Sequence, residues 1–233
     1  MFLNDLQAQI YGFFASRYKL FLKVWFVAYL VIVVSSAFGT YLFYKSPDLS
    51  IWLTAIGKKF GQVAIMLLGA IVLPGILGRF RIEIKITRLI TLFRRQLGIT
   101  VFLLAFAHYY FLRLLPSIEN RVLPYKNLAV FEIFGLAAFS IFFFMFLTSN
   151  NWSMRVLGRW WKYLHRFIYV ALWLLVLHTG IRKISTLTLF IGIFAALEII
   201  SWIYYFFNKN KKDAGDASAT PADGGGALAK KPV

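Results

Sequence analysis

The chain has 233 residues, of which 60% are hydrophobic and only 15% are charged. Soluble globular proteins carry about 25% charged residues, so this composition excludes an ordinary water-soluble enzyme and predicts a protein that crosses a membrane several times. The net charge of +17 does not indicate nucleic-acid binding, because the lysines and arginines lie between apolar stretches rather than along one polar surface. Cysteine is absent, which excludes disulfides, iron–sulfur clusters and covalently attached c-type haem.

Six apolar stretches are long enough to cross a bilayer, because a helix needs about 20 residues to span a hydrocarbon core of about 30 Å. They occupy residues 24–44, 60–78, 96–112, 128–149, 164–181 and 184–207. The alternating pattern of a membrane β-barrel is missing, so we predict an all-α, polytopic six-helix bundle. No glycine-rich dinucleotide-binding motif follows a predicted strand, so we expect no flavin or nicotinamide domain in these residues.

The basic residues predict the direction of the spans and the parts of the chain. Seventeen lysines and arginines flank the spans on the side of the two termini, against eight on the other side, so both termini are expected in the cytoplasm. We expect a cytoplasmic N-terminal segment over 1–23 and a six-span membrane domain over 24–207. The composition then changes to Lys, Asp, Ala, Gly and Pro, which predicts a disordered cytoplasmic tail over 208–233.

Two of the three histidines lie at matching depths. His108 is five residues before Arg113, and His178 is four residues before Arg182, each at the outer end of its span. Both spans run outward, so the two imidazoles are expected within about 1.5 Å of the same depth. Two helices that each present one imidazole at one level provide the axial ligands of a six-coordinate b-type haem. The alternative is that both histidines are buried, hydrogen-bonded residues between helices.

The third histidine, His165, lies at the inner end of the fifth span beside Arg166. It precedes His178 by 13 residues, which is about 20 Å along a helix and would suit a second haem nearer the cytoplasm. An ideal helix turns by about 220° over that length, so the two histidines share a face only if the helix bends. The alternative is a structural histidine at the membrane interface.

Two runs of sequence carry a resemblance to a known family. They are RRQLGITVFLLAFAHYYF at residues 94–111 and FLTSNNWSMRVLGRWWKYLHRFIYVALWLLVLH at residues 146–178. The chain resembles the ferric-reductase-like transmembrane domain family, and within it the haem-binding membrane subunits of bacterial periplasmic methionine sulfoxide reductase systems. The resemblance implies a b-type cytochrome of the bacterial inner membrane, in which His108 and His178 match haem-ligand positions and His165 matches a further functional histidine.

The resemblance also implies partners and cofactors. Such subunits pass electrons from the quinol pool or from a cytoplasmic flavin reductase to a separate periplasmic reductase. Larger relatives present two histidines in the third span, whereas this chain has Arg94 where the second would stand, so an inner haem would need another ligand. We therefore expect one haem b, with a second haem, a quinone or FMN as candidates for an inner site near Arg94 and Arg95.

Two further features have open interpretations. The basic stretch 79–95 is expected either to lie on an anionic leaflet or to dock an acidic flavoprotein, with Arg94 and Arg95 near haem propionates or a flavin phosphate. Glu198 lies inside the last span, where an unpaired carboxylate is costly, so we expect a structural hydrogen bond or a role in handling protons or quinone.

Two rival functions stay open as well. One is a ferric or other metal reductase that uses a separate flavoprotein as its electron donor. The other is a cofactor-free transporter or membrane scaffold, for which broken spans or paired charges in mid-membrane would be typical.

Overall fold

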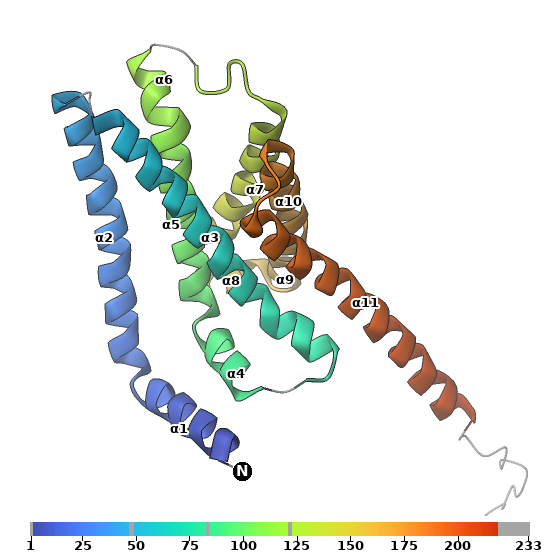
Figure 1. Ribbon diagram of the computed structural model, residues 1–233. Coiled ribbons are helices and arrows are strands. Elements are labelled where there is room, and N and C mark those ends of the chain that lie inside the picture. Colours follow the sequence, from blue (N-terminus) through green and yellow to red (C-terminus); the bar gives the residue numbers. More distant parts are fainter. Residues whose placement is uncertain (1, 47–48, 83, 121–122, 219–233) are drawn as a thin grey trace, which may run out of the picture.

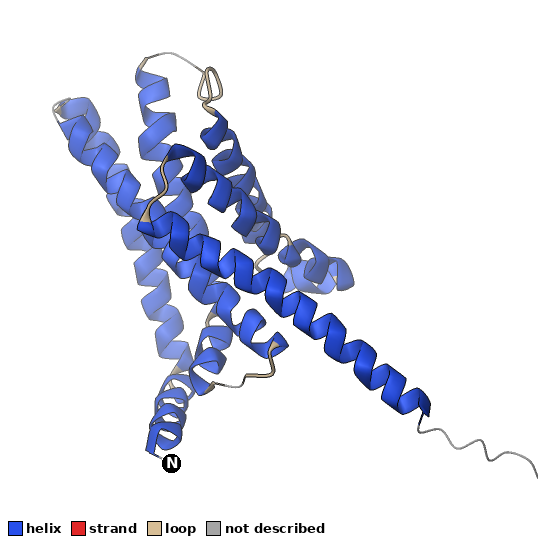
Figure 2. Ribbon diagram, turned by 45° about the vertical axis from the view of Figure 1, so that its right-hand side comes forward, coloured by secondary structure: helices blue, strands red, loops and turns tan. Residues whose placement is uncertain are grey.

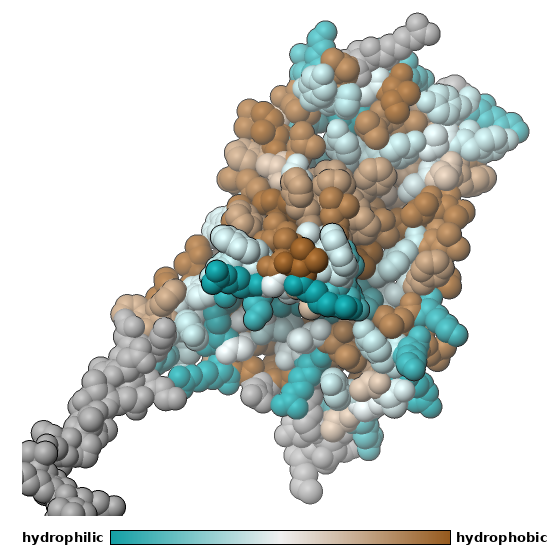
Figure 3. Space-filling view, turned by 180° about the vertical axis from the view of Figure 1, so that it is seen from behind, coloured by the Kyte–Doolittle hydropathy of each residue, from teal (hydrophilic) through white to brown (hydrophobic). Residues whose placement is uncertain are grey.

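The structure is a computed structural model that describes residues 2–46, 49–82, 84–120 and 123–218. Every regular element in these ranges is a helix (Figures 1 and 2). Six of the described helices are long and apolar enough to cross a membrane, which confirms the predicted all-α, multi-pass architecture. Figure 3 shows apolar side chains covering the middle of one face, with hydrophilic side chains gathered towards its lower end.

The six spans follow one another along the chain. They are α2 (Tyr18–Lys45), α3 (Ser50–Arg79), α5 (Arg94–Tyr109) with its continuation, α7 (Val130–Leu147), α9 (Arg159–Arg166) followed by α10 (Ile168–Arg182), and α11 (Thr186–Ser218). The third span continues beyond α5 through the π-helical turn η2 (Tyr110–Leu114) and α6 (Leu115–Glu119). Three short helices, α1 (Phe2–Ser16), α4 (Lys85–Leu92) and α8 (Asn151–Leu157), lie outside the spans.

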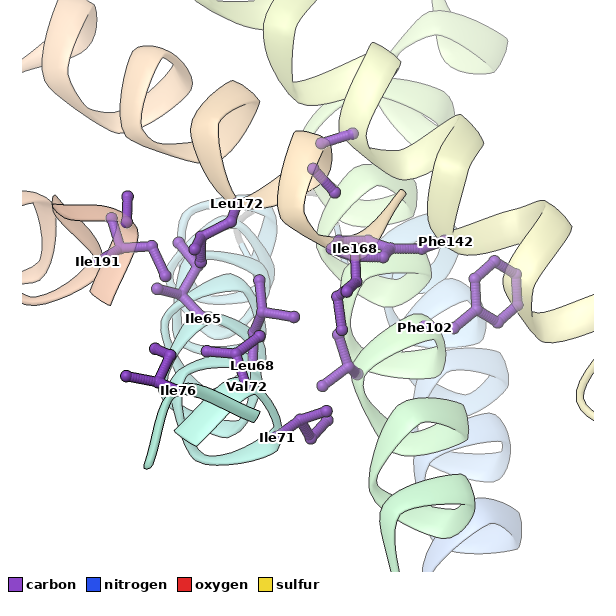
Figure 4. Close-up of a cluster of buried hydrophobic side chains, with 14 residues drawn as sticks. Ile65, Leu68, Ile71, Val72, Ile76, Phe102, Phe142, Ile168, Leu172 and Ile191 are labelled. Carbon is purple, nitrogen blue, oxygen red and sulfur yellow. The ribbon is translucent and has the colours of Figure 1, made fainter. Parts of the chain in front are cut away.

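The core lies among five of the spans and leaves α2 at the edge. Helix α3 packs against α5 and α11, and α10 packs against α7 and α11, whereas α2 packs mainly along α5 (Figure 1). Ile65, Leu68 and Val72 on α3 belong to one buried cluster with Phe142 of α7 and Leu172 of α10 (Figure 4). Phe102 of α5 belongs to the same cluster and stacks on rings of α7. Because lipid is as apolar as these side chains, close packing rather than water exclusion holds this core together.

Several helices extend beyond the expected spans, and the two longest extensions are in α3 and α11. Helix α3 begins at Ser50, ten residues before the predicted stretch 60–78, and includes Lys58 and Lys59. Lysine is a good helix former whose long side chain can reach the membrane surface, so a charge ends an apolar run without ending the helix. Helix α11 continues to Ser218, into the predicted tail 208–233. Extending an existing helix needs no new nucleus, and residues 219–233 lie outside the described residues.

A buried ion pair joins α3 to α11. Arg79 Nη2 lies 3.4 Å from Glu198 Oε1, and the two side chains are 12% and 6% exposed. Arg79 also donates from Nε to Ser201 Oγ at 2.8 Å and from Nη1 to Tyr169 Oη at 3.2 Å. Its guanidinium lies over the rings of Tyr169 and Trp202. The structure therefore supports a structural role for Glu198, as the buried partner of Arg79.

Removing one partner of this pair should destabilise the bundle strongly. Arg79→Met leaves the Glu198 carboxylate buried without its cation, which costs about 3–5 kcal/mol. The free energy of unfolding in detergent measures this loss. The double variant Arg79→Met/Glu198→Leu is expected to recover most of it, because no buried charge remains. If the double variant is as unstable as Arg79→Met alone, the pair does not act as a unit.

Candidate functional site

His108 and His178 lie in matching environments on two helices of the bundle and line the same cavity. Nδ1 of His108 on α5 is 2.9 Å from the carbonyl oxygen of Gly57 on α3. Nδ1 of His178 on α10 is 2.7 Å from the carbonyl oxygen of Phe131 on α7. A carbonyl oxygen only accepts, so each Nδ1 carries the hydrogen and donates it. Each neutral ring therefore keeps an unprotonated Nε2 as a ligand, the arrangement typical of histidines that bind a metal.

The two rings are spaced as the ligands of one ion would be. Their centroids are 6.4 Å apart and their planes are nearly perpendicular, at 87°. A metal–histidine bond is about 2.0 Å and an imidazole nitrogen lies about 1.1 Å from its ring centre, so rings on opposite sides of one ion have centroids about 6.2 Å apart. The observed separation fits one iron atom held between the two rings. The structure thus brings together the pair that matching depths predict.

Two glycines let the rings approach the neighbouring helices. A methyl group placed on Gly61 of α3 would lie 2.6 Å from Nδ1 of His108, and one placed on Gly135 of α7 would lie 2.6 Å from Nδ1 of His178. Each glycine follows the carbonyl that accepts the histidine N–H by four residues, which is about one helical turn. Each ring therefore lies in a groove that any larger residue would fill.

A cavity of about 400 Å³ opens beside the two histidines, and we call it the paired-histidine cavity. Its walls are mostly apolar and include Ile65, Val101, Leu136, Phe139, Phe142 and Leu175. This volume falls within the range of about 300–1,000 Å³ that is usual for small-molecule and cofactor sites. An apolar slot closed by two neutral imidazoles is chemically suited to a flat, hydrophobic macrocycle.

Cations gather at the mouth of the paired-histidine cavity. Lys58, Arg182 and Lys183 line it and are exposed. Arg113 also lines the cavity, but its guanidinium donates to the carbonyl oxygens of Pro124 and Lys126 and lies 3.8 Å from a carboxylate oxygen of Glu132. Arg113 therefore holds the loop before α7, and the three other cations are placed to meet an acidic group at the mouth.

His165 is placed away from the pair. Its Nε2 lies 3.3 Å from Thr148 Oγ1, and its ring stacks on Trp161 with centroids 4.0 Å apart. The fifth span breaks at Phe167, between α9 and α10, so the ideal-helix rotation between His165 and His178 does not apply. Among the described residues, no group of three or more His, Cys, Asp or Glu side chains is placed to hold a metal ion.

His165 lines a second cavity of about 930 Å³, which we call the basic cavity. Its lining includes the cations Arg79, Arg94, Arg95, Lys162 and Arg166. Arg95 donates from Nε to the carbonyl oxygen of Ser149 at 2.9 Å and from Nη2 to Asn151 Oδ1 at 2.8 Å. The described lining holds no carboxylate, so this cavity favours an anionic ligand.

The two cavities share a wall made by Val101 and Phe142, which line both. Phe102, the neighbour of Val101, stacks on Phe146 with ring centroids 4.3 Å apart and on Phe139 with centroids 5.6 Å apart. A thin apolar partition thus separates the paired histidines from the basic cavity.

The sequence did not predict several residues of the site. Nothing in the sequence distinguishes Gly135 or the carbonyl groups that accept from the histidines. Gly57 and Gly61 could have been noticed, because they lie four residues apart on one helix face. Gln96 also lines the basic cavity, and its Oε1 is buried without a hydrogen-bond partner among the described residues. The signal for Gln96 was a polar amide inside an apolar span, directly after two arginines.

Comparison with known proteins shows the family of the chain. The family described as "Ferric reductase like transmembrane component" matches residues 60–176, which is half of the chain. The match includes His108, and His178 lies two residues beyond its end. Among curated proteins, the chain is 33% identical over 82 residues to the "Protein-methionine-sulfoxide reductase heme-binding subunit MsrQ" of Brucella ovis, Brucella canis and Brucella suis. That alignment covers 34% of this chain and 37% of each relative. No solved structure matches the chain. With half of its length matched by the family, the chain belongs to the ferric reductase like transmembrane components.

Proposed function

We propose that this protein is a membrane b-type cytochrome that relays electrons across the bacterial inner membrane. The observation that carries the proposal is the pair His108 and His178, with ring centroids 6.4 Å apart and both Nδ1 atoms donating to carbonyl oxygens. Haem b bound between the two rings would supply the one-electron redox chemistry. The protein's residues hold the two imidazoles in one tautomer, exclude water and set the polarity around them.

A porphyrin fits these residues better than a bare metal ion. Two imidazoles leave most positions of an ion open, and no further His, Cys, Asp or Glu is placed among the described residues to fill them. A porphyrin provides four nitrogen ligands itself and needs only two axial ligands from the protein. The relatives' printed name, a heme-binding subunit, supports the same choice.

The excess of basic residues supports the orientation in which both termini are cytoplasmic. His108 and His178 then lie towards the periplasm, and the basic cavity with His165, Arg94 and Arg95 lies towards the cytoplasm. Electrons would enter from quinol or a cytoplasmic flavin reductase and leave to a periplasmic reductase. The relatives' name supports a methionine sulfoxide reductase as that acceptor. The basic cavity is our candidate for an inner cofactor: a second haem with His165, a quinone or FMN.

A second candidate function is direct reduction of ferric iron or another metal ion by the haem, with a separate flavoprotein as electron donor. The match to the ferric reductase like family favours it. Stopped-flow oxidation of the reduced protein by ferric chelates, compared with oxidation by an exported reductase encoded beside it, separates the two functions.

The reduced-minus-oxidised visible spectrum of the purified protein tests the proposal. We expect the absorption bands of a low-spin b-type haem. If the protein carries no haem even after expression with excess haem precursor, the proposal is rejected. The alternative of a cofactor-free transporter or membrane scaffold would then be favoured.

The cations at the mouth of the paired-histidine cavity should raise the haem reduction potential. A cation near the haem stabilises the reduced form, which carries one more negative charge than the oxidised form. Lys58→Gln is therefore expected to lower the midpoint potential by some tens of mV in a redox titration. Lys59→Gln is the matched control, because it removes the same charge from the next residue, which does not line the cavity. Equal shifts in the two variants would assign the effect to overall charge instead.

A further inference from the structure

A second buried cluster lies where α2 meets the start of α3 and the π-helical turn η2. Its members are Phe43 of α2, Leu53 of α3, Phe111 of η2 and Leu115 of α6. None of these four side chains lines the paired-histidine cavity. However, η2 begins two residues after His108, and π-helical turns occur frequently at functional sites. The cluster therefore adjoins a candidate haem ligand from outside its cavity.

The side chain of Phe111, which is only 3% exposed, fits between two glycines on different helices. A methyl group placed on Gly39 of α2 would lie 2.8 Å from Cζ of Phe111. One placed on Gly57 of α3 would lie 2.9 Å from Cβ of Phe111 and 2.5 Å from Cδ1 of Leu112. The tip of the Phe111 side chain thus lies against α2, and its base lies against α3.

Gly57 connects this packing to His108. Its carbonyl oxygen accepts the hydrogen bond from Nδ1 of His108 at 2.9 Å. A hydrogen bond of this kind selects the tautomer of a metal-binding imidazole and orients its ring. Phe111 and Leu112 lie against the α-carbon of the same glycine. The position of the accepting carbonyl therefore depends on how Phe111 is packed.

Further contacts keep the ring of Phe111 in place. It stacks on Phe60 with centroids 6.3 Å apart and meets the ring of Tyr110 edge-on at 5.4 Å. Tyr110 Oη in turn lies 2.8 Å from Thr40 Oγ1 of α2. Thr40 donates its own hydrogen to the carbonyl oxygen of Ser36, so Tyr110 is the donor to Thr40. Packing and a hydrogen bond thus both join α2 to the turn that follows His108.

We propose that Phe111 is a positioning residue for His108: packed against α2, it holds the Gly57 carbonyl in place and so sets the plane of the imidazole. The inference rests on the proposed function, because it concerns the geometry of a haem ligand. It also gives a role to α2, which lies at the edge of the bundle (Figure 1). His178 depends instead on the carbonyl of Phe131 on α7. A change in α2 should therefore disturb one imidazole of the pair and spare the other.

Gly39→Ala is the first test, because its methyl group would displace the ring of Phe111. Alanine favours a helix more than glycine does, so α2 itself should stay intact. The measurement is NMR of the full-length protein as purified, reduced, in detergent and labelled on its histidine nitrogens. Reduced low-spin haem iron is diamagnetic, so the imidazole resonances of a haem-loaded sample stay narrow.

Each imidazole N–H can be assigned by its loss when that histidine is replaced, because the chain has only three histidines. In Gly39→Ala we expect the Nδ1–H resonance of His108 to shift and to exchange with water about tenfold faster, the factor for the loss of one hydrogen bond. The resonance of His178 should keep its position and its exchange rate, which makes it the internal control.

The double variant Gly39→Ala/Phe111→Leu separates positioning from a general loss of stability. Leucine is shorter than phenylalanine and leaves room for the added methyl group, so the His108 resonance should return towards its original position. Two neighbouring positions that act together are expected to be non-additive in this way. A merely structural role would give losses of stability that add, without recovery of the resonance. Ser35→Ala is the matched control on α2, because this exposed side chain donates to Ile32 within its own helix.

The electron paramagnetic resonance spectrum and the midpoint potential of the haem give a second readout. The planes of the two imidazoles are 87° apart, and Gly39→Ala should change that angle, so the low-spin signal should become less anisotropic. A weaker hydrogen bond makes His108 a less basic ligand, which favours reduced iron and should raise the midpoint potential. Haem per chain should stay unchanged, because both ligands are still present.

An unchanged His108 resonance in Gly39→Ala would reject the inference. Equal shifts of His108 and His178 would also reject it, because they would assign the effect to the whole bundle. Phe111→Leu adds no atom to the core and should shift the same resonance even if Gly39→Ala does not fold. Absence of haem from the unmodified protein would reject the cytochrome instead, and the NMR comparison would still decide whether Phe111 positions the imidazole.

Discussion

Replacing either His108 or His178 with alanine should remove the haem from the purified protein. In the proposed cytochrome each ring would supply one axial ligand, and the 6.4 Å between their centroids would leave room for one iron atom. Loss of a residue that only orients a metal ligand costs about 10–100-fold in affinity, so loss of the ligand itself should cost at least that much. Haem per chain, measured as the pyridine haemochrome after purification, is expected to fall at least about tenfold in both variants.

His165→Ala is the matched control for this experiment, because it removes an imidazole from the adjoining segment of the same span. His165 lines the basic cavity rather than the paired-histidine cavity, so the haem between His108 and His178 should stay. A fall from two haems to one would assign His165 to a second haem. Loss of all haem in His165→Ala, with haem retained in either of the other variants, would contradict the proposed pairing.

Replacing Gly61 or Gly135 with alanine should have nearly as large an effect, although neither residue is a ligand. The added methyl group would lie 2.6 Å from Nδ1 of the histidine that rests against each glycine. The ring must then move and lose its hydrogen bond to the backbone, which misplaces Nε2. We expect about a 10–100-fold loss of haem affinity, measured by titrating haem into the purified haem-free protein.

The glycine variants have an internal check on folding. Alanine in place of glycine within a helix is favourable by about 1 kcal/mol, so loss of haem should occur without loss of helix. Gly78→Ala on α3 and Gly192→Ala on α11 are suitable controls, because an added methyl group meets no atom within 4 Å at either position. Normal haem binding by Gly61→Ala would show that the ring of His108 does not need this groove.

The sequence was sufficient to predict the six-span architecture and the closeness of His108 and His178, whose ring centroids are 6.4 Å apart. The lengths of the apolar stretches predict the six spans, because a bilayer has a fixed thickness and each span needs about 20 apolar residues to cross it. The matching depths of His108 and His178 were predicted from their distances to Arg113 and Arg182 with the rise of an ideal α-helix. The π-helical turn at Tyr110–Leu114 lies between His108 and Arg113 and was not foreseen. This prediction needed no knowledge of which helices are neighbours, only that two spans run in the same direction and end at one level.

The remaining features depend on packing between helices, which a single sequence does not reveal. The sequence does not show that Gly135 packs against His178 of α10, because this contact depends on how the two helices are placed. It also does not show that Glu198 pairs with Arg79, which lies at the end of another span. The helix breaks at Phe167 without a proline, so nothing in the sequence indicated the break. The relative orientation of His165 and His178 therefore could not be derived from the rotation of an ideal helix. The start of the second span was placed too late because Lys58 and Lys59 continue α3, whereas the sixth span ends at Asn208, close to the predicted end, and only its helix continues to Ser218.

The electron paramagnetic resonance spectrum of the oxidised, purified protein tests the central claim most directly, because it reports the ligands of the iron and their relative orientation. Imidazole planes at 87° predict the highly anisotropic low-spin signal that is characteristic of a ferric haem between two perpendicular histidines. This signal should be absent from His108→Ala and from His178→Ala. A high-spin, five-coordinate signal in the unmodified protein, or a low-spin signal that survives both substitutions, would contradict the account.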